Sequence, residues 1–238
     1  MLTIKGKHAI EEALSTGSPI RHIYISQGSE NNKDMRHIQL IARQKRINTT
    51  VISNQEFKQR FTDSHTQNIV AEMGAVTHIP FESILQDSTK FSKLVILDHL
   101  EDPHNFGAIA RTCVALGIDA IIYPKDRQAG ITSGVMKASS GAIYHIPLSR
   151  VANIGNAVDQ LKRNHIWIYG TDVTTGENLS TARINEPFAL VVGNESKGIS
   201  NRGSKLVDLN VHIPMSGNLD SLNVSVATGI ILYKFLNQ

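Results

Sequence analysis

Three polar side chains stand at the start of the most apolar helix pattern in this sequence. Ser221, Asn223 and Ser225 lie where "IPMSGNLDSLNVSVATGIILY", residues 213–233, changes from a loop rich in Ser, Gly and Asn into an almost continuous apolar segment. Asn and Ser at such a position accept hydrogen bonds from the orphan amides of a first helical turn. Capping is one interpretation, and a polar ligand site at the helix mouth is the other.

A second polar group follows the apolar run "LVILD" in the stretch "DHLEDPHNFGAIARTC", residues 98–113. Asn105 precedes a helix pattern whose apolar stripe contains Ile109 and Cys113, whereas Arg111 lies on another face among small residues. A guanidinium in that setting can reach a phosphate or a carboxylate in a cleft. A surface arginine and a helix-capping asparagine are the simpler interpretations of the two residues.

Three of the predicted strands end in glycine and small polar residues, namely "YGTD", "VVGNESKG" and "IPMSG", which begin at residues 169, 191 and 213. Such residues let the backbone approach a ligand and present amide and carbonyl groups to it, although each alone is also an ordinary turn. Glu195 is the acid of the second segment. We therefore predict that Glu195, Asn105, Arg111, Ser221 and Asn223 converge on one polar cleft.

Several other chemistries lack their residue patterns. Neither G-x-G-x-x-G nor G-x-x-x-x-G-K-[ST] occurs after the first apolar run of the second half, which argues against dinucleotide-binding and P-loop enzymes. No serine–histidine–acid or cysteine–histidine order stands out. Cys113 is the single cysteine, and none of the ten histidines has zinc-ligand spacing, so no metal is expected.

The elements that position these residues form two predicted domains in a chain of 238 residues. Residues 1–73 alternate helix and strand patterns, which is typical of a small α/β domain. Residues 74–90 lose clear periodicity and are interpreted as a linker. In residues 91–238, six apolar runs ("LVILD", "AIIYP", "YHIPL", "IWIYG", "ALVVG", "NVHIP") are mostly separated by helix-length segments. This pattern predicts a largely parallel, six-stranded sheet covered by helices, with its ligand beyond the carboxyl ends of the strands.

Composition and charge limit the class of protein. With 41% hydrophobic and 19% charged residues, the chain is expected to be globular. Its apolar runs are only strand-sized and its N-terminal helix pattern carries two acids, so we expect no membrane span, no secretory signal and a cytoplasmic location. The net charge is +3, and residues 33–60 hold seven basic residues against two acids. A helix is predicted over residues 33–46, with Met35, Ile38, Ile41 and Ala42 on one apolar stripe. Arg36 and Arg43 share another face of this helix, which indicates either a solvated surface or phosphate contacts.

The three polar stretches also resemble a known family. "DHLEDPHNFGAIARTC", "LVVGNESKGIS" and "IPMSGNLDSLNVSVATGIILY" are similar to the three ordered motifs of the SpoU (TrmH-like) RNA ribose methyltransferases of the SPOUT superfamily. The resemblance runs from about Lys93 to Gln238. "IKGKHAIEEAL" and "HTQNIVAEM" resemble the L30e-like substrate-binding domain of the family's bacterial large-subunit rRNA enzymes, and the overall layout is most similar to the RlmB-type 23S rRNA guanosine 2′-O-methyltransferases.

This resemblance implies S-adenosylmethionine as methyl donor, an RNA substrate, a homodimer and a deep trefoil knot. By motif position, Asn105, Arg111, Glu195, Ser221 and Asn223 take the catalytic places. The implied donor-binding residues are Gly193, Ile213 and Leu222 with their neighbours Thr171, Asn194 and Met215. The basic residues implied to contact RNA are Arg36, Arg43, Lys45 and Arg46. The loop at residues 218–220 differs among relatives and affects no implied catalytic position.

The implied reaction is an in-line displacement from a sulfonium to a ribose hydroxyl, which needs alignment and proton removal but no metal. Because a guanidinium is a poor base, Arg111 is expected to orient the adjacent phosphate rather than to accept the proton. A tRNA ribose methyltransferase and an antibiotic-resistance rRNA methylase are the alternatives within this enzyme class. A non-catalytic RNA-binding protein is the alternative outside it.

Overall fold

The chain divides into two compact units, Met1–Ala75 and Val76–Gln238. The computed structural model describes residues 2–62, 65–171, 176–194, 198–199, 205–217 and 221–237. Among these, no helix is both long and apolar enough to cross a membrane.

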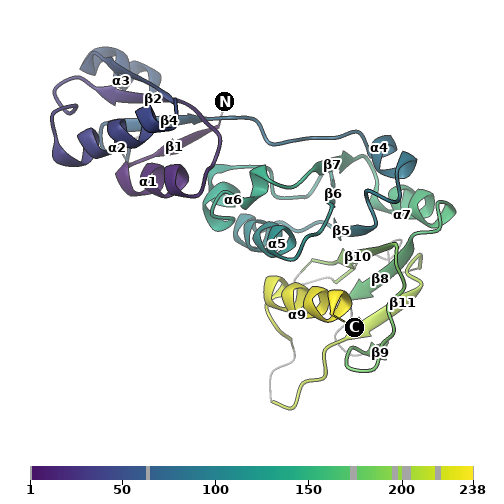
Figure 1. Cartoon of the computed structure of the whole chain (residues 1–238). Helices are drawn as coiled ribbons and strands as arrows, with labels where there is room; N and C mark the ends of the chain where they lie inside the picture. Colours follow the sequence, from purple (N-terminus) through teal and green to yellow (C-terminus); the bar gives the residue numbers. More distant parts are fainter. Residues whose placement is uncertain are drawn as a thin grey trace. The chain divides into compact units, whose positions relative to one another are not determined.

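The first unit is a four-stranded sheet with helices, as the alternating pattern predicts (Figure 1). Its strands are β1 (Thr3–Lys5), β2 (Ile20–Ser26), β3 (Asn48–Ile52) and β4 (Ile69–Met73). They are arranged in the order β1-β4-β2-β3, with β2 and β3 parallel and the other pairs antiparallel. The helices are α1 (Lys7–Ser15), α2 (Lys33–Gln44) and α3 (Asn54–Arg60).

Helix α2 shows how local sequence sets the ends of an element. The side chain of Asn32 caps its first turn by accepting a hydrogen bond from the backbone N–H of Asp34. Met35, Ile38 and Ala42 are buried, as the apolar stripe predicts. The sequence pattern extends the helix to residue 46, but Arg46 has a φ of 57°, in the left-handed region that ends a helix. The helix therefore stops at Gln44.

The second unit is built on a parallel sheet. Its strands are β5 (Lys93–Leu97), β6 (Ala120–Pro124), β7 (Leu148–Val151), β8 (Trp167–Thr171), β9 (Glu177–Asn178), β10 (Phe188–Val192) and β11 (Leu209–His212). Their order is β7-β6-β5-β10-β8-β11-β9, and every neighbouring pair is parallel. The parallel arrangement predicted from the apolar runs is thus confirmed.

Two details of the predicted sheet are wrong. Among the described residues the sheet has seven strands rather than six, because the two-residue β9 is polar and carries no apolar run. The run "YHIPL" is also placed too early, since Ala142–Tyr144 forms a single 3-10 turn (η1) and β7 begins only at Leu148.

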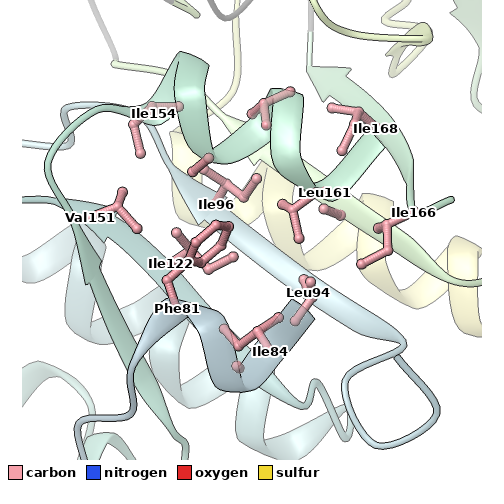
Figure 2. Close-up of a cluster of buried hydrophobic side chains, with 14 of the residues drawn as sticks. Phe81, Ile84, Leu94, Ile96, Ile122, Val151, Ile154, Leu161, Ile166 and Ile168 are labelled. Atoms are coloured by element: carbon pink, nitrogen blue, oxygen red, sulfur yellow. The ribbon is translucent and has the colours of Figure 1, made fainter. Parts of the chain in front are cut away.

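One face of this sheet is covered by α4 (Phe81–Gln86) and α7 (Ile154–Arg163). Figure 2 shows Leu161 of α7 and Phe81 and Ile84 of α4 packed in one cluster with Leu94, Ile96 and Ile122 of the sheet. Residues 74–90, interpreted from the sequence as a linker, therefore include a helix whose apolar side chains belong to the second unit's core. A helix of six residues is too short to show periodicity.

The other face carries α5 (Pro103–Ala115), α6 (Ser133–Ala138) and α9 (Val224–Leu236) (Figure 1). Phe235 of α9 packs edge-on against Tyr169 and Phe188 of the sheet. Gly107 allows α6 to approach α5, because an added Cβ would lie only 2.5 Å from the Cβ of Ala138. Since α5 follows β5 directly and Asn223 at the start of α9 is hydrogen-bonded to Asn105 of α5, these two helices meet at the carboxyl edge of the sheet.

We predict that Ile38→Ala lowers the free energy of unfolding of the first unit by about 2–5 kcal/mol, because Ile38 is fully buried on α2. Leu40→Ala is the matched control on the same helix, where the side chain is 55% exposed. It should change stability by no more than about 0.5 kcal/mol. Urea unfolding of both variants measures the difference, and equal decreases would contradict this packing of α2.

Candidate functional site

The centre of the candidate site is a hydrogen bond between two asparagines that lie 118 positions apart. Asn223 donates from its Nδ2 to Oδ1 of Asn105 over 3.0 Å. The Oδ1 of Asn223 accepts from the backbone N and from Oγ of Ser225, at 2.9 and 2.6 Å. Asn223 therefore caps α9 through its oxygen and reaches the first motif through its nitrogen, so that capping and site formation use different atoms of one side chain.

Asn105 does not cap its own helix. The cap of α5 is Asp102, whose Oδ1 accepts from the backbone N–H of His104 at 2.9 Å. Asn105 lies one turn further in and is 8% exposed, with its side chain directed to Asn223 rather than to the helix end. The capping alternative that the sequence leaves open for Asn105 is thus wrong.

Arg111 lies two turns further along α5 with an exposed side chain. Its Nη1 donates a hydrogen bond to Oγ of Ser140 over 3.2 Å. This distance is long for a hydrogen bond, and the acceptor is an uncharged hydroxyl group. No carboxylate within the described residues forms a salt bridge with Arg111. A guanidinium carries a permanent charge and five N–H donors in a planar arrangement, which suits an anion such as a phosphate.

The second motif follows β10 and folds back on itself. The backbones of Asn194 and Gly198 exchange two hydrogen bonds, at 2.9 and 2.8 Å, and Nδ2 of Asn194 donates to the carbonyl of His99 at 2.9 Å. A Cβ added at Gly193 would overlap the backbone of Gly198 and Ile199. The sequence suggests that Gly193 leaves space for a ligand, but in the structure that space is filled by the chain itself.

The remaining predicted donor-binding residues follow neighbouring strands. Thr171 is the last residue of β8, and Ile213 and Met215 follow β11, which pairs with β8. Because β10 pairs with the other side of β8, Gly193 and Asn194 lie at the same edge of the sheet. Leu222 is half-buried and Ser221 is exposed just before α9. Glu195 lies outside the residues that the structure describes.

Sequence reasoning missed two residues at the end of β5. Asp98 has a fully buried side chain, and its Oδ1 lies 2.6 Å from Nδ1 of His99. His99 has a φ of 61°, which is unusual for a residue other than glycine. In a parallel sheet, ligands bind beyond the carboxyl ends of the strands. The polar pair "DH" directly after a buried strand is therefore the sequence signal that could have identified Asp98 and His99 as site residues.

Neither metal nor thiol chemistry has support in this unit. Within the described ranges, no three His, Cys, Asp or Glu side chains are grouped to hold a metal ion. Complete burial raises the pKa of the Cys113 thiol far above its ordinary value, so the sulfur stays protonated and unreactive. Cys113 therefore serves as a small apolar residue of α5.

In the first unit, three of the predicted basic residues line one hollow. Arg36, Arg43 and Arg46 surround a shallow groove of about 720 Å³, together with Gln39, Leu40, Ile47, Asn48 and Thr49. The left-handed turn at Arg46 ends α2 there and leads into β3. Lys45 is exposed but does not line the groove. We call this surface, between α2 and the edge strand β3, the arginine groove.

Comparisons with known proteins agree with this architecture. The model of the SpoU rRNA Methylase family matches residues 92–233, and the model for RNA 2'-O ribose methyltransferase substrate binding matches residues 3–78. A putative TrmH family tRNA/rRNA methyltransferase of Staphylococcus epidermidis is 35% identical over 98% of this chain and 94% of its own length.

Two solved structures are also similar. The SpoU methyltransferase AviRb of Streptomyces viridochromogenes, in complex with AdoMet, is 26% identical, with a TM-score of 0.72 over 99% of this chain and 89% of that one. The TrmH/SpoU tRNA modifying enzyme of A. aeolicus is 33% identical, with a TM-score of 0.55 over 66% of this chain and 83% of that one.

The parallel sheet with polar groups at its carboxyl edge is that of an α/β protein, and the match of the family model to residues 92–233 makes this protein one of the methyltransferase class. The matches over nearly the whole length specify it further. The chain belongs to the SpoU rRNA methylase family, whose members include the TrmH-type RNA methyltransferases.

We predict that Gly193→Ala lowers the melting temperature of the chain without any ligand, by the equivalent of roughly 1–3 kcal/mol, because the new methyl group overlaps the loop's own backbone. Gly217→Ala is the matched control, since a Cβ there meets no atom within 4 Å. Thermal melts of both variants test this. A Gly193→Ala protein that melts like the wild type and only loses ligand affinity would show that the glycine serves the ligand instead.

Proposed function

We propose that this chain transfers a methyl group from S-adenosylmethionine to the ribose 2′-hydroxyl of a guanosine in 23S rRNA. The observation that carries the proposal is the Asn223–Asn105 hydrogen bond, which joins the first and third motifs at the carboxyl edge of a parallel sheet. A protein that only binds RNA has no need for a polar contact between these two motifs. Asn105 is buried whereas Asn223 is exposed, so the hydrogen bond helps to satisfy the one amide whose burial would otherwise be costly.

The donor fits the edge formed by β10, β8 and β11. We assign its binding to Thr171, Gly193, Asn194, Ile213, Met215 and Leu222, which lie at the ends of these strands or precede α9, with Gly193 contributing through its backbone groups. Backbone N–H and C=O groups of such loops suit the polar edge of an adenine and the donor's amino-acid group. The AviRb complex with AdoMet supports the same ligand class. When bound, the donor supplies an activated methyl group on a sulfonium, so no metal is required.

The catalytic roles follow from charge and position. We assign Arg111 to the phosphate next to the acceptor ribose, where its permanent charge lowers the pKa of the hydroxyl without accepting the proton. Asn105 and Asn223, with Ser221 beside them, are assigned to hold the donor and the ribose in line. Glu195 is assigned to position Arg111 or Asn105.

The first unit supports rRNA rather than tRNA as the substrate. Its arginine groove offers three guanidinium groups to a phosphate backbone. The matching family model is described as substrate binding and spans residues 3–78. The A. aeolicus tRNA modifying enzyme aligns with 66% of this chain, whereas AviRb aligns with 99% of it. The tRNA modifying enzyme thus matches a smaller part of this chain than AviRb does.

A homodimer and a trefoil knot belong to the same proposal. Val226, Ile230 and Tyr233 are 51%, 41% and 63% exposed, and their spacing of four and three residues puts them on one stripe of α9. Such a stripe of large apolar side chains suits a symmetric contact with a second copy. The return of α9 to the first motif after β11 is the feature that supports the knotted arrangement.

We predict that Arg111→Ala lowers single-turnover methylation of 23S rRNA by about 10²–10³-fold, because it removes charge stabilisation at the reacting hydroxyl. Arg111→Lys should restore little of the lost methylation rate, since an ammonium group does not reproduce the two parallel N–H donors of a planar guanidinium. Donor affinity by calorimetry and the melting temperature should stay near wild type. The control is Arg163→Ala at the exposed end of α7. An unchanged rate for Arg111→Ala would remove this residue from the active site.

We predict that the double variant Arg36→Glu/Arg43→Glu weakens RNA binding and makes it less sensitive to salt. The slope of the logarithm of the binding constant against the logarithm of the salt concentration should become shallower by about 0.7 for each phosphate that the protein no longer neutralises. Donor binding should not change. Filter binding at several salt concentrations measures the slope, with Arg163→Glu on α7 as a single charge-reversal control outside the groove. A slope equal to that of the wild type would show that the arginine groove does not bind phosphates.

A further inference from the structure

A second hollow lies at the carboxyl ends of β5, β6 and β7, apart from the residues assigned to the donor. Its volume is about 230 Å³, and it is lined by His99, Pro124, Asp126, Arg127 and the turn at residues 152–155 that starts α7. It borders the proposed active site, because the carbonyl of its residue His99 accepts the hydrogen bond from Asn194. We call it the 126 pocket.

The walls of the 126 pocket are held in an unusual backbone conformation. His99 and Arg127 have φ angles of 61° and 51°, and both face the same hollow. Residues other than glycine adopt such angles at a cost, so the surrounding contacts must hold them in place. Two hydrogen bonds join the loops that carry them, from Leu100 N to Oε1 of Gln128 at 2.9 Å and from Ala129 N to the carbonyl of Leu100 at 2.8 Å. The pocket is therefore preorganised.

The lining suits one flat heteroaromatic ring. Pro124 and Ile154 are buried apolar residues, and the His99 ring offers a further stacking face. Asp126 and Arg127 are exposed at the rim and supply an acceptor and a donor side by side in sequence. The volume is below the range usual for drug-sized ligands, which favours a single base over a dinucleotide.

The pairing of a carboxylate with a guanidinium selects among the bases. Guanine presents two adjacent N–H donors, at N1 and N2, which one carboxylate accepts together, and its O6 and N7 are common partners of arginine. Arg150 adds a positive charge at the same edge, since its Nη2 donates to the carbonyl of Lys125 at 2.9 Å. Arg127, Arg150 and Lys125 outnumber the carboxylates of Asp126 and of Asp98, whose Oδ1 lies 2.6 Å from Nδ1 of His99. An excess of positive charge suits RNA, whose bases are flanked by phosphates.

We infer that the 126 pocket receives the base of one unpaired guanosine of the RNA substrate, with Asp126 accepting from N1–H and the N2 amine and Arg127 donating to O6. This inference rests on the proposed function and adds to it the chemical feature by which the enzyme recognises its RNA. It places base recognition in the second unit, on loops distinct from those that bind the donor. The arginine groove would then contribute affinity for the RNA backbone, whereas the 126 pocket would contribute sequence specificity.

The test combines protein variants with an RNA variant. The RNA is a 23S rRNA fragment that the wild type methylates, made once with guanosine and once with inosine, which lacks the N2 amine. The wild type should lose about tenfold or more in kcat/KM on inosine RNA. Asp126→Asn should lose a similar factor on guanosine RNA and should discriminate little between the two RNAs. Arg127→Gln should lose activity on both RNAs.

The control is Asp159→Asn on α7, which removes one carboxylate from the same unit outside the pocket and should keep the wild-type preference. Calorimetry should give unchanged donor affinity for all variants. Equal rates on the two RNAs, or an Asp126→Asn protein that keeps the wild-type preference, overturn this inference alone. A wild-type chain that binds the donor but methylates no RNA overturns the proposed function and this inference with it.

Discussion

The hydrogen bond from Asn223 to Asn105 is the contact on which the candidate site depends. It fixes the mouth of the last helix against the first turns of α5, while Phe235 anchors the other end of α9 against Tyr169 and Phe188 of the sheet. The apolar contacts set where the helix lies, and the polar contact sets its register along α5. Because Asn223 also caps α9, removal of this side chain affects the helix and the site together.

The parallel sheet explains why polar loops far apart in sequence share one edge. Parallel strands all end at the same side, so the loops after β5, β10, β8 and β11 meet there regardless of their order in the chain. The central pair β5 and β10 divides this edge. The loops after β10, β8 and β11 carry the residues assigned to the donor, and those after β5, β6 and β7 carry the 126 pocket.

Much of the fold follows from residue patterns, and the exceptions have physical causes. Five of the six apolar runs coincide with strands of the parallel sheet, because strands covered on both faces need apolar side chains along their length. The two-residue β9 and the short α4 escape detection, since neither is long enough to show a period. The end of α2 is not predicted because a left-handed residue such as Arg46 is not marked by its type. Among the site residues, the cap at Asn223 and the three arginines of the groove are identified from sequence, whereas Asp98, His99 and Asp126 are not.

The sequence by itself determined which residues are polar at strand ends and helix starts, because capping and turn preferences are local. It also determined the family, through three ordered motifs. Only the tertiary structure decided which of these residues meet. The partner of Asn223, the burial of Asp98 and the backbone that excludes a side chain at Gly193 all depend on segments remote in the chain. Such contacts arise from packing in three dimensions, and a linear pattern carries no information on distances between loops that the sheet brings to one edge.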